Sequence, residues 1–314
     1  MEALTYSPAR VAELLGVREK AVTAALDRVL YSAADVWELR QKLGRLPPSL
    51  GSTRKQLFLN FKGGTGKTSV STNYGFRMAE MGYRVLIIDL DSQGHATKCL
   101  GYEGEEFERT LLDVLVKKVP LAEVVQPTPM PNLSFVPSNL SMSTVDLALM
   151  PMAGREYKLR NALKDLEGQY DLILFDAPPS FGLLNLNSLV AADDLFVPVL
   201  ADFPSFHGLK LLFDTVRSLE EDLGHVLSNI FIVVNAFNQT FKLAKEALEA
   251  LRTHYPEYLL PNVVRQCTKF AQASSEGVPV FVSAPDSKGA EDIQAVIDTV
   301  LKRLRTQSKR AVAK

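Results

Sequence analysis

From Gln56 onward the chain alternates between short apolar runs and longer stretches whose apolar residues recur at helical spacing. The apolar runs predict strands, and the stretches between them predict helices. We expect strands at 57–61, 84–90, 133–136, 171–175, 195–199, 230–235 and 259–264. The clearest helices are expected at 67–81, 206–223, 241–254 and 291–304. Apolar strands separated by helices are typical of a parallel sheet covered on both faces, so we predict a doubly wound, mostly parallel α/β fold.

The first 46 residues have a different pattern and predict a small helical module. Ser7 and Pro8 are typical of the start of a helix over 8–15, which Gly16 ends. Helical spacing resumes over 19–30, and Tyr31-Ser32 then precedes a third helix. A helix–glycine–helix followed by Tyr-Ser-x-x-Asp resembles the MerR-like helix-turn-helix.

Proline and glycine residues mark the boundaries between segments of the chain. Residues 47–54 carry two prolines, a glycine and small polar residues, which predict a linker between the module at 1–46 and a main domain at 55–304. Residues 305–314 hold basic residues and no acid, and we expect a basic C-terminal tail there.

The composition is that of a globular protein, with 46% hydrophobic and 23% charged residues. The formal net charge is −1, so any basic patch must be local. The two cysteines, Cys99 and Cys267, are far apart and outside any C-x-x-C pair, which favours a reducing compartment. No run approaches the length of a membrane span. The tail offers only small apolar residues after Leu304, so we expect a cytoplasmic protein without a membrane partner.

The strongest chemical signal is a glycine-rich loop that follows a predicted strand and opens a helix. Glycines let backbone N–H groups approach a phosphate, and the helix N-terminus adds a favourable dipole. Lys67 would neutralise the outer phosphates, and the Thr68 hydroxyl would bind Mg²⁺. The predicted nucleotide-binding residues here are Lys62, Gly63, Gly64, Thr65, Gly66, Lys67, Thr68 and Ser69.

This loop departs from the standard P-loop pattern at its start. Phe61 occupies the slot of the first glycine, and a second lysine, Lys62, opens the loop. The form K-G-G-x-G-K-T resembles the deviant Walker A motif of the ParA/MinD group of P-loop ATPases. The resemblance implies that ATP binding produces a homodimer in which Lys62 reaches the partner's phosphates, which makes Lys62 a catalytic candidate.

Two further acidic motifs follow predicted strands, where the ligand crevice of a doubly wound fold lies. The segment 89–97, D-L-D-S-Q-G-H-A-T, is similar to the family's D-x-D-P-Q-G-N-A-T, with Ser92 and His95 as departures. The resemblance implies that Asp91 positions or activates the attacking water and that Asp89 supports the magnesium shell. Asp176 in D-A-P-P-S matches the Walker B acid, which binds Mg²⁺ through water.

The resemblance covers about residues 55–304 and implies several partners. Asn235 ends a strand whose terminal asparagine reads adenine in the MinD-like branch. ATP-bound ParA dimers bind DNA without sequence preference, and a ParB-like partner stimulates hydrolysis. The candidate DNA-binding residues are Arg265, Lys269, Lys302, Arg303 and Arg305.

The leading functional hypothesis is therefore an Mg²⁺-dependent ATPase that segregates or positions DNA, or positions a protein cargo, on the nucleoid. An alternative is a transcriptional repressor switched by ATP. In that case the second helix of the N-terminal module, with Arg18, Lys20, Thr23 and Arg28, would enter a major groove. The module could equally be a dimerisation or adaptor unit, because its seven basic and six acidic residues form no strongly basic face. An iron–sulfur reductase shares the P-loop, but Cys99 and Cys267 do not match the required cluster cysteines.

Overall fold

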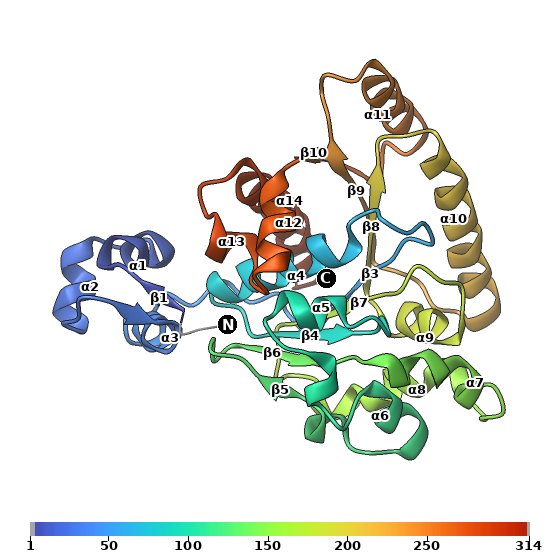
Figure 1. The fold of residues 1–314 in the computed structure, drawn as a ribbon, viewed down its shortest axis with the longest axis horizontal. Coiled ribbons are helices and arrows are strands. Elements are labelled where there is room, and N and C mark those ends of the chain that lie inside the picture. The colour runs from blue at the N-terminus through green and yellow to red at the C-terminus, as the bar shows by residue number, and fades with distance from the viewer. Residues whose placement is uncertain (1–3, 313–314) are drawn as a thin grey trace.

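The computed structural model describes residues 4–312, with side chains to residue 307. The main domain is built on an eight-stranded sheet in the order β10-β9-β8-β3-β7-β4-β6-β5 (Figure 1). Its strands are β3 (Arg54–Phe58), β4 (Val85–Asp89), β5 (Gln126–Pro127), β6 (Leu133–Val136), β7 (Leu172–Asp176), β8 (Asp194–Leu200), β9 (Asn229–Phe237) and β10 (Leu259–Arg265). Neighbouring strands are parallel, except that the short β5 is antiparallel to β6. The predicted doubly wound, mostly parallel sheet is confirmed.

Alternate residues of each central strand pack on opposite faces of the sheet. Phe58 of β3 belongs to the hydrophobic core on one face, whereas its neighbour Leu57 belongs to the core on the other. All five residues of β4 and of β7 are buried, as expected for strands covered on both faces. This burial explains why these strands read as continuous apolar runs in the sequence.

Helices cover both faces of the sheet (Figure 1). They are α4 (Lys67–Glu80), α5 (His95–Cys99), α6 (Leu111–Lys117), α7 (Val145–Leu149), α8 (Lys158–Ala162), α9 (Leu183–Ala191), α10 (Pro204–Leu223), α11 (Lys242–His254), α12 (Thr268–Ser275), α13 (Val280–Ser283) and α14 (Lys288–Val312). Helices α4 and α12–α14 share the core of one face, and α6–α11 share the core of the other. The carboxyl ends of the parallel strands therefore meet at one open edge, where α4 begins.

The N-terminal module (residues 4–46) contains three helices and a two-stranded antiparallel sheet that the sequence pattern did not predict. Its elements are β1 (Thr5–Tyr6), α1 (Pro8–Leu15), α2 (Glu19–Ala25), β2 (Tyr31–Ser32) and α3 (Ala33–Lys42). The Ser7 cap of α1 and the Ser32 cap of α3 are present. Helix α2 was expected to run to residue 30 but ends at Ala25. The buried Tyr31 side chain donates to the Leu26 carbonyl, and pairing of β2 with β1 draws the chain out of the helix.

The N-terminal module is docked on the main domain at the C-terminal end of α4. Its apolar residues belong to the same core cluster as those of α4 and α14. The buried guanidinium of Arg40 donates to the carbonyls of Leu14, Arg45 and Glu80, at 3.0, 2.9 and 2.9 Å. Gly82 permits this approach, because a Cβ there would lie 2.4 Å from Arg40 Cδ. A cation at the C-terminus of a helix is also favoured by the helix dipole.

The C-terminal helix α14 is longer than the predicted 291–304 and continues to Val312. Gln307 and Asn229 exchange two hydrogen bonds of 2.8 and 3.1 Å, which attach the end of the helix to the start of β9. Residue 305 therefore continues a packed helix. The remainder of the predicted basic tail, from residue 308, lies outside the described side chains.

We predict that the Arg40→Met variant lowers the free energy of unfolding by about 2–4 kcal/mol, because three carbonyls, of which that of Glu80 is buried, lose a charged donor while the apolar stem is retained. The Lys42→Met control removes an exposed cation that pairs only with the exposed Glu38, and should change stability by less than about 0.5 kcal/mol. Urea unfolding of both variants measures the difference. Equal stabilities would show that the Arg40 contacts do not hold the module.

Candidate nucleotide-binding site

The glycine-rich loop lies between β3 and α4, at the open edge of the sheet. Gly66 adopts a left-handed conformation with φ of 86°, and a Cβ at this position would lie 2.0 Å from Asn235 Nδ2. That nitrogen donates to the Thr65 carbonyl at 2.9 Å. Asn235 of β9 thus lies beside the loop, and its amide braces the loop backbone. A role of Asn235 in reading adenine stays a prediction.

The two lysines of the loop have different surroundings. Lys67 is buried, and its Nζ donates to the Lys62 carbonyl at 3.3 Å. Burial lowers the pKa of Lys67, while the charges of Asp176 and Asp91 oppose this change. Lys62 is bound elsewhere, since its Nζ lies 2.7 Å from the carboxylate of Asp202, which follows β8. Only Lys67 is therefore placed to hold phosphates in its own loop.

A cluster of oxygen ligands surrounds Asp176 at the end of β7. The hydroxyls of Thr68 and Ser71 each donate to this carboxylate at 2.7 Å. Burial raises the Asp176 pKa to about 6, although both hydroxyls and the Lys67 charge favour ionisation. Hydroxyl and carboxylate oxygens are ligands that Mg²⁺ prefers, and a cation here would offset the cost of burying the carboxylate. The residues fit a nucleotide-bound Mg²⁺, with Thr68 and Asp176 brought together as predicted.

Asp89 has a different environment from Asp176. Its Oδ2 accepts hydrogen bonds from the Thr97 backbone N–H and hydroxyl, both at 2.8 Å, and its Oδ1 accepts one from Asp91 N–H at 3.1 Å. Burial and the nearby Asp176 raise the Asp89 pKa to about 8, despite these hydrogen bonds. The contacts favour a role in shaping the chain from Asp91 to Thr97, and the place of Asp89 in the magnesium shell stays a prediction.

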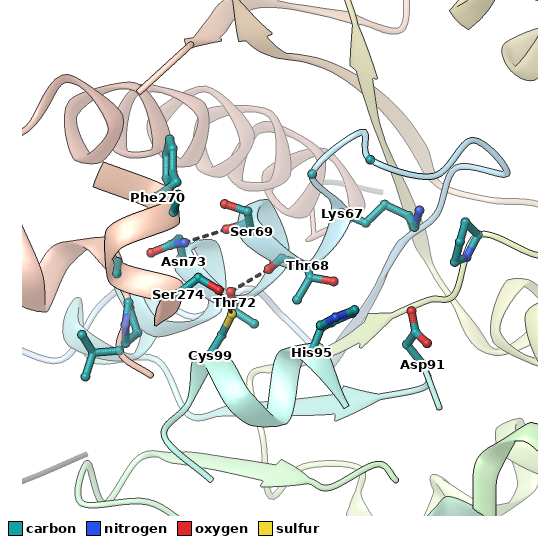
Figure 2. Close-up of a pocket in the computed structure, with 17 residues that line it drawn as sticks. Lys67, Thr68, Ser69, Thr72, Asn73, Asp91, His95, Cys99, Phe270 and Ser274 are labelled. Carbon is teal, nitrogen blue, oxygen red and sulfur yellow. Dashed lines mark hydrogen bonds between the residues drawn. The ribbon is translucent and has the colours of Figure 1, made fainter. Parts of the chain in front are cut away.

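A cavity of about 450 Å³ lies over the loop, between α4, α5 and α12. Figure 2 shows Lys67 and Asp91 at one end and Phe270 and Ser274 on the opposite wall. The Asp91 carboxylate lines this space, and one of its oxygens also accepts from Gln93 N–H at 3.0 Å. A carboxylate beside the phosphate-binding lysine can orient a water molecule for attack on a phosphate.

Comparison with known proteins agrees with this geometry. A family model described as an AAA domain matches residues 53–229. Cell division protein PomZ of Myxococcus xanthus is 73% identical over 304 residues, which cover 97% of this chain and 95% of that protein. Chromosome partitioning protein ParA of the same organism is 30% identical over 251 residues, which cover 80% of this chain and 89% of that one. The chain belongs to the ParA/MinD family of ATPases.

A solved structure extends the comparison to ligands. Cobyrinic acid a,c-diamide synthase from Mycobacterium smegmatis, with a bound ATP analogue and magnesium, superposes with a TM-score of 0.71 and 26% identity, covering 81% of this chain and 97% of that one. As a ParA/MinD-family member the present protein is an ATPase that uses ATP and Mg²⁺. When bound, Mg²⁺ would neutralise phosphate charge beside Thr68 and Asp176.

The structure separates the basic residues predicted to bind DNA. Arg265 binds Asp292 through both its backbone N–H and its guanidinium, and it also pairs with Glu291. Arg303 donates to the Glu257 carbonyl and lies over the Phe231 ring, and Arg305 donates to the Tyr83 hydroxyl. Lys269 and Lys302 are exposed. Because α14 advances 1.5 Å per residue, the Arg265 partners lie about 16 Å from Arg303 along the helix.

Sequence reasoning missed several residues that shape the site. Ser71 lies one helical turn after Thr68 on α4, so the i, i+3 spacing could have indicated that both hydroxyls face Asp176. Thr97, which donates two hydrogen bonds to Asp89, is the last residue of the acidic motif 89–97 and carries no separate signal. Asp202 carries no local signal, because its contact with Lys62 joins residues 140 positions apart.

In the described residues, none of the helices is both long and apolar enough to cross a membrane.

We predict that Lys67→Ala and Asp91→Ala separate nucleotide binding from hydrolysis. We expect Lys67 to contact phosphates in the ground state, so its loss should weaken ATP binding by about 100-fold. We expect Asp91 to act on the attacking water, so its loss should preserve binding and lower the single-turnover rate by ~10²–10⁴-fold. Fluorescent-nucleotide titration and single-turnover hydrolysis measure both quantities. Hydrolysis at the parent rate in Asp91→Ala would contradict the assignment and make Asp89 the next candidate.

Proposed function

We propose that this ATPase forms a homodimer in the ATP state, with two nucleotide sites facing one another, and that the dimer binds DNA without sequence preference. A partner bound to the cargo stimulates hydrolysis and so releases the protein from the nucleoid. The observation that carries the proposal is Lys62. Its Nζ forms an ion pair with Asp202 and is not committed to its own phosphate loop. Its charge therefore becomes available to a second nucleotide once that ion pair opens.

The cargo we favour is a protein assembly that acts in cell division. This choice rests on the similarity to cell division protein PomZ, which extends over 97% of the chain and therefore includes most of the N-terminal module. Segregation of a plasmid or chromosome with a ParB-like partner is the second candidate, favoured by the similarity to chromosome partitioning protein ParA over 80% of the chain.

The contacts of the N-terminal module favour an adaptor or dimerisation role over reading an operator. Arg28, one of the four residues expected in a major groove, pairs with Asp35 at 3.0 Å. The exposed Glu19 lies between the exposed Arg18 and Lys20 in the sequence, and the exposed Asp27 directly precedes Arg28. A surface with balanced charge gains little from the DNA phosphates. The repressor hypothesis accordingly has less support than the positioning hypothesis.

The dimer is tested by light scattering with ATP or ADP in the Asp91→Ala background, which blocks turnover. We expect a dimer in ATP and a monomer in ADP, and we expect Lys62→Ala to remain monomeric in ATP because no lysine reaches the second nucleotide. Lys55→Ala is the control: this lysine pairs with Glu167 and lies at the other end of the domain. An ATP-dependent dimer of Lys62→Ala would remove the basis of the proposal.

DNA binding is tested with Lys269→Glu, because Lys269 is exposed and makes no ion pair in the described structure. In ATP, the parent should bind unrelated DNA sequences with similar affinity, which falls steeply between roughly 50 and 200 mM salt. Lys269→Glu should weaken binding to all of them and lower the salt dependence by about one ion per lost phosphate contact. Nucleotide affinity should be unchanged.

Lys164→Glu supplies the matched control, since it makes the same charge change at an exposed position just before β7, away from the open edge. Retention of the DNA on a filter measures both variants. Equal loss in both would indicate a general charge effect, and binding restricted to one sequence would favour the repressor hypothesis.

A further inference from the structure

The loop of residues 177–182 joins β7 to α9 and forms part of the nucleotide cavity through Pro179. Pro178 and Pro179 have no backbone N–H, and the described hydrogen bonds include none donated by the backbone of residues 178–182. The loop follows directly after Asp176, the carboxylate that holds Thr68. Its position beside the phosphates must therefore be fixed by groups outside the loop.

One side chain supplies most of this support. Asn185, in the first turn of α9, donates from Nδ2 to the carbonyl of Pro178 at 3.0 Å and to that of Ser180 at 2.6 Å. These two carbonyls lie on either side of Pro179. The Asn185 side chain is buried, with 2% of the residue exposed, whereas Pro178 is half-buried and Ser180 is exposed, so Asn185 holds this surface segment from the core side.

The far end of the loop is held independently. Asp146 of α7 accepts a hydrogen bond from Leu184 N–H at 2.8 Å, and a Cβ at Gly182 would lie 1.9 Å from the same carboxylate. The beginning of the loop is held by Ala177 N–H, which donates to the Phe58 carbonyl at 3.2 Å. Loss of Asn185 would therefore release the middle of the loop while both of its ends stay attached.

The other atom of the Asn185 amide indicates that this residue serves more than stability. Its Oδ1 is buried and has no hydrogen-bond partner in the described structure. An unpaired buried acceptor costs about 1–3 kcal/mol, whereas an apolar residue of the same shape carries no such cost. We therefore infer that the amide of Asn185 is kept at this position because its two donated hydrogen bonds are needed for function.

We propose that Asn185 is a positioning residue for ATP hydrolysis, which holds Pro179 at a fixed place opposite Asp91 and Thr68. Asn185 acts through the loop and does not touch the nucleotide. Phosphate binding belongs to the glycine-rich loop and Lys67, so Asn185 affects the geometry of the attacking water and leaves ground-state affinity unchanged. Small displacements at such a position lower a rate by up to ~100-fold.

The test compares Asn185→Leu with the parent protein. Leucine has a similar shape and removes the unpaired acceptor together with the two donors. The carbonyls of the half-buried Pro178 and the exposed Ser180 can bond to water instead, so stability should change little. We expect the single-turnover rate of ATP hydrolysis to fall by ~10–100-fold while nucleotide affinity stays within about threefold of the parent. Asn185→Ala serves as the second variant, and light scattering in ATP confirms that the mass of the variant matches the parent.

Asn187→Leu is the matched control, because Asn187 is a buried residue of the same helix whose amide donates to the carbonyls of Arg155 and Leu183 and not to the loop. It should lower the unfolding temperature and leave the hydrolysis rate of the folded protein unchanged. Three results would each overturn the proposal: a parental rate in both Asn185 variants, an affinity loss as large as the rate loss, or an equal rate loss in Asn187→Leu. A molecular mass of the Asn185 variants in ATP that differs from that of the parent would also overturn it, because the rate loss would then come from altered assembly.

Discussion

The nucleotide site depends on the buried carboxylate of Asp176 and the hydrogen bonds it accepts. It ends the central strand β7 and accepts hydrogen bonds from two hydroxyls of α4, so it joins the middle of the sheet to the helix that starts at the phosphate loop. Burial raises its pKa to about 6, so a positive ligand at this place would favour the ionised carboxylate. Asp89 lies directly beside it in the sheet and accepts a hydrogen bond from the Thr97 backbone, so the two neighbouring acids have different partners.

Much of the main domain could be predicted because its signals are local. The strands are apolar runs buried on both faces, and α4 starts directly after the glycines that precede it in the sequence. The placement of Lys67, Thr68 and Asp176 could be predicted for the same reason, since a phosphate loop and an acid at a strand end are short patterns. The structure brings these three side chains together, as that pattern requires.

What could not be predicted depends on contacts between distant residues. Helix α2 has a helical pattern to residue 30, but the buried Tyr31 and its strand pairing end the helix earlier. Helix α14 continues past residue 304 because Gln307 meets Asn229, which lies 78 positions away. Basic character alone also did not show that Arg265 forms ion pairs with two acids at the start of α14, and its role in DNA binding stays a prediction. A basic residue can bind DNA phosphates, but its ion-pair partners within the protein affect how available its charge is to them.

The docking of the N-terminal module has a practical consequence for work with shortened chains. The matched family region begins at residue 53, which makes it a natural choice for an expression boundary. A protein that begins at residue 53 would lack Arg40, which donates to the Glu80 carbonyl at the end of α4. The apolar surface of α4 that packs on the module would also be exposed to water. Self-association through newly exposed apolar surface is independent of ATP. Such a fragment would aggregate and mimic an oligomer, so a test of the proposed nucleotide-dependent assembly requires the module to be present.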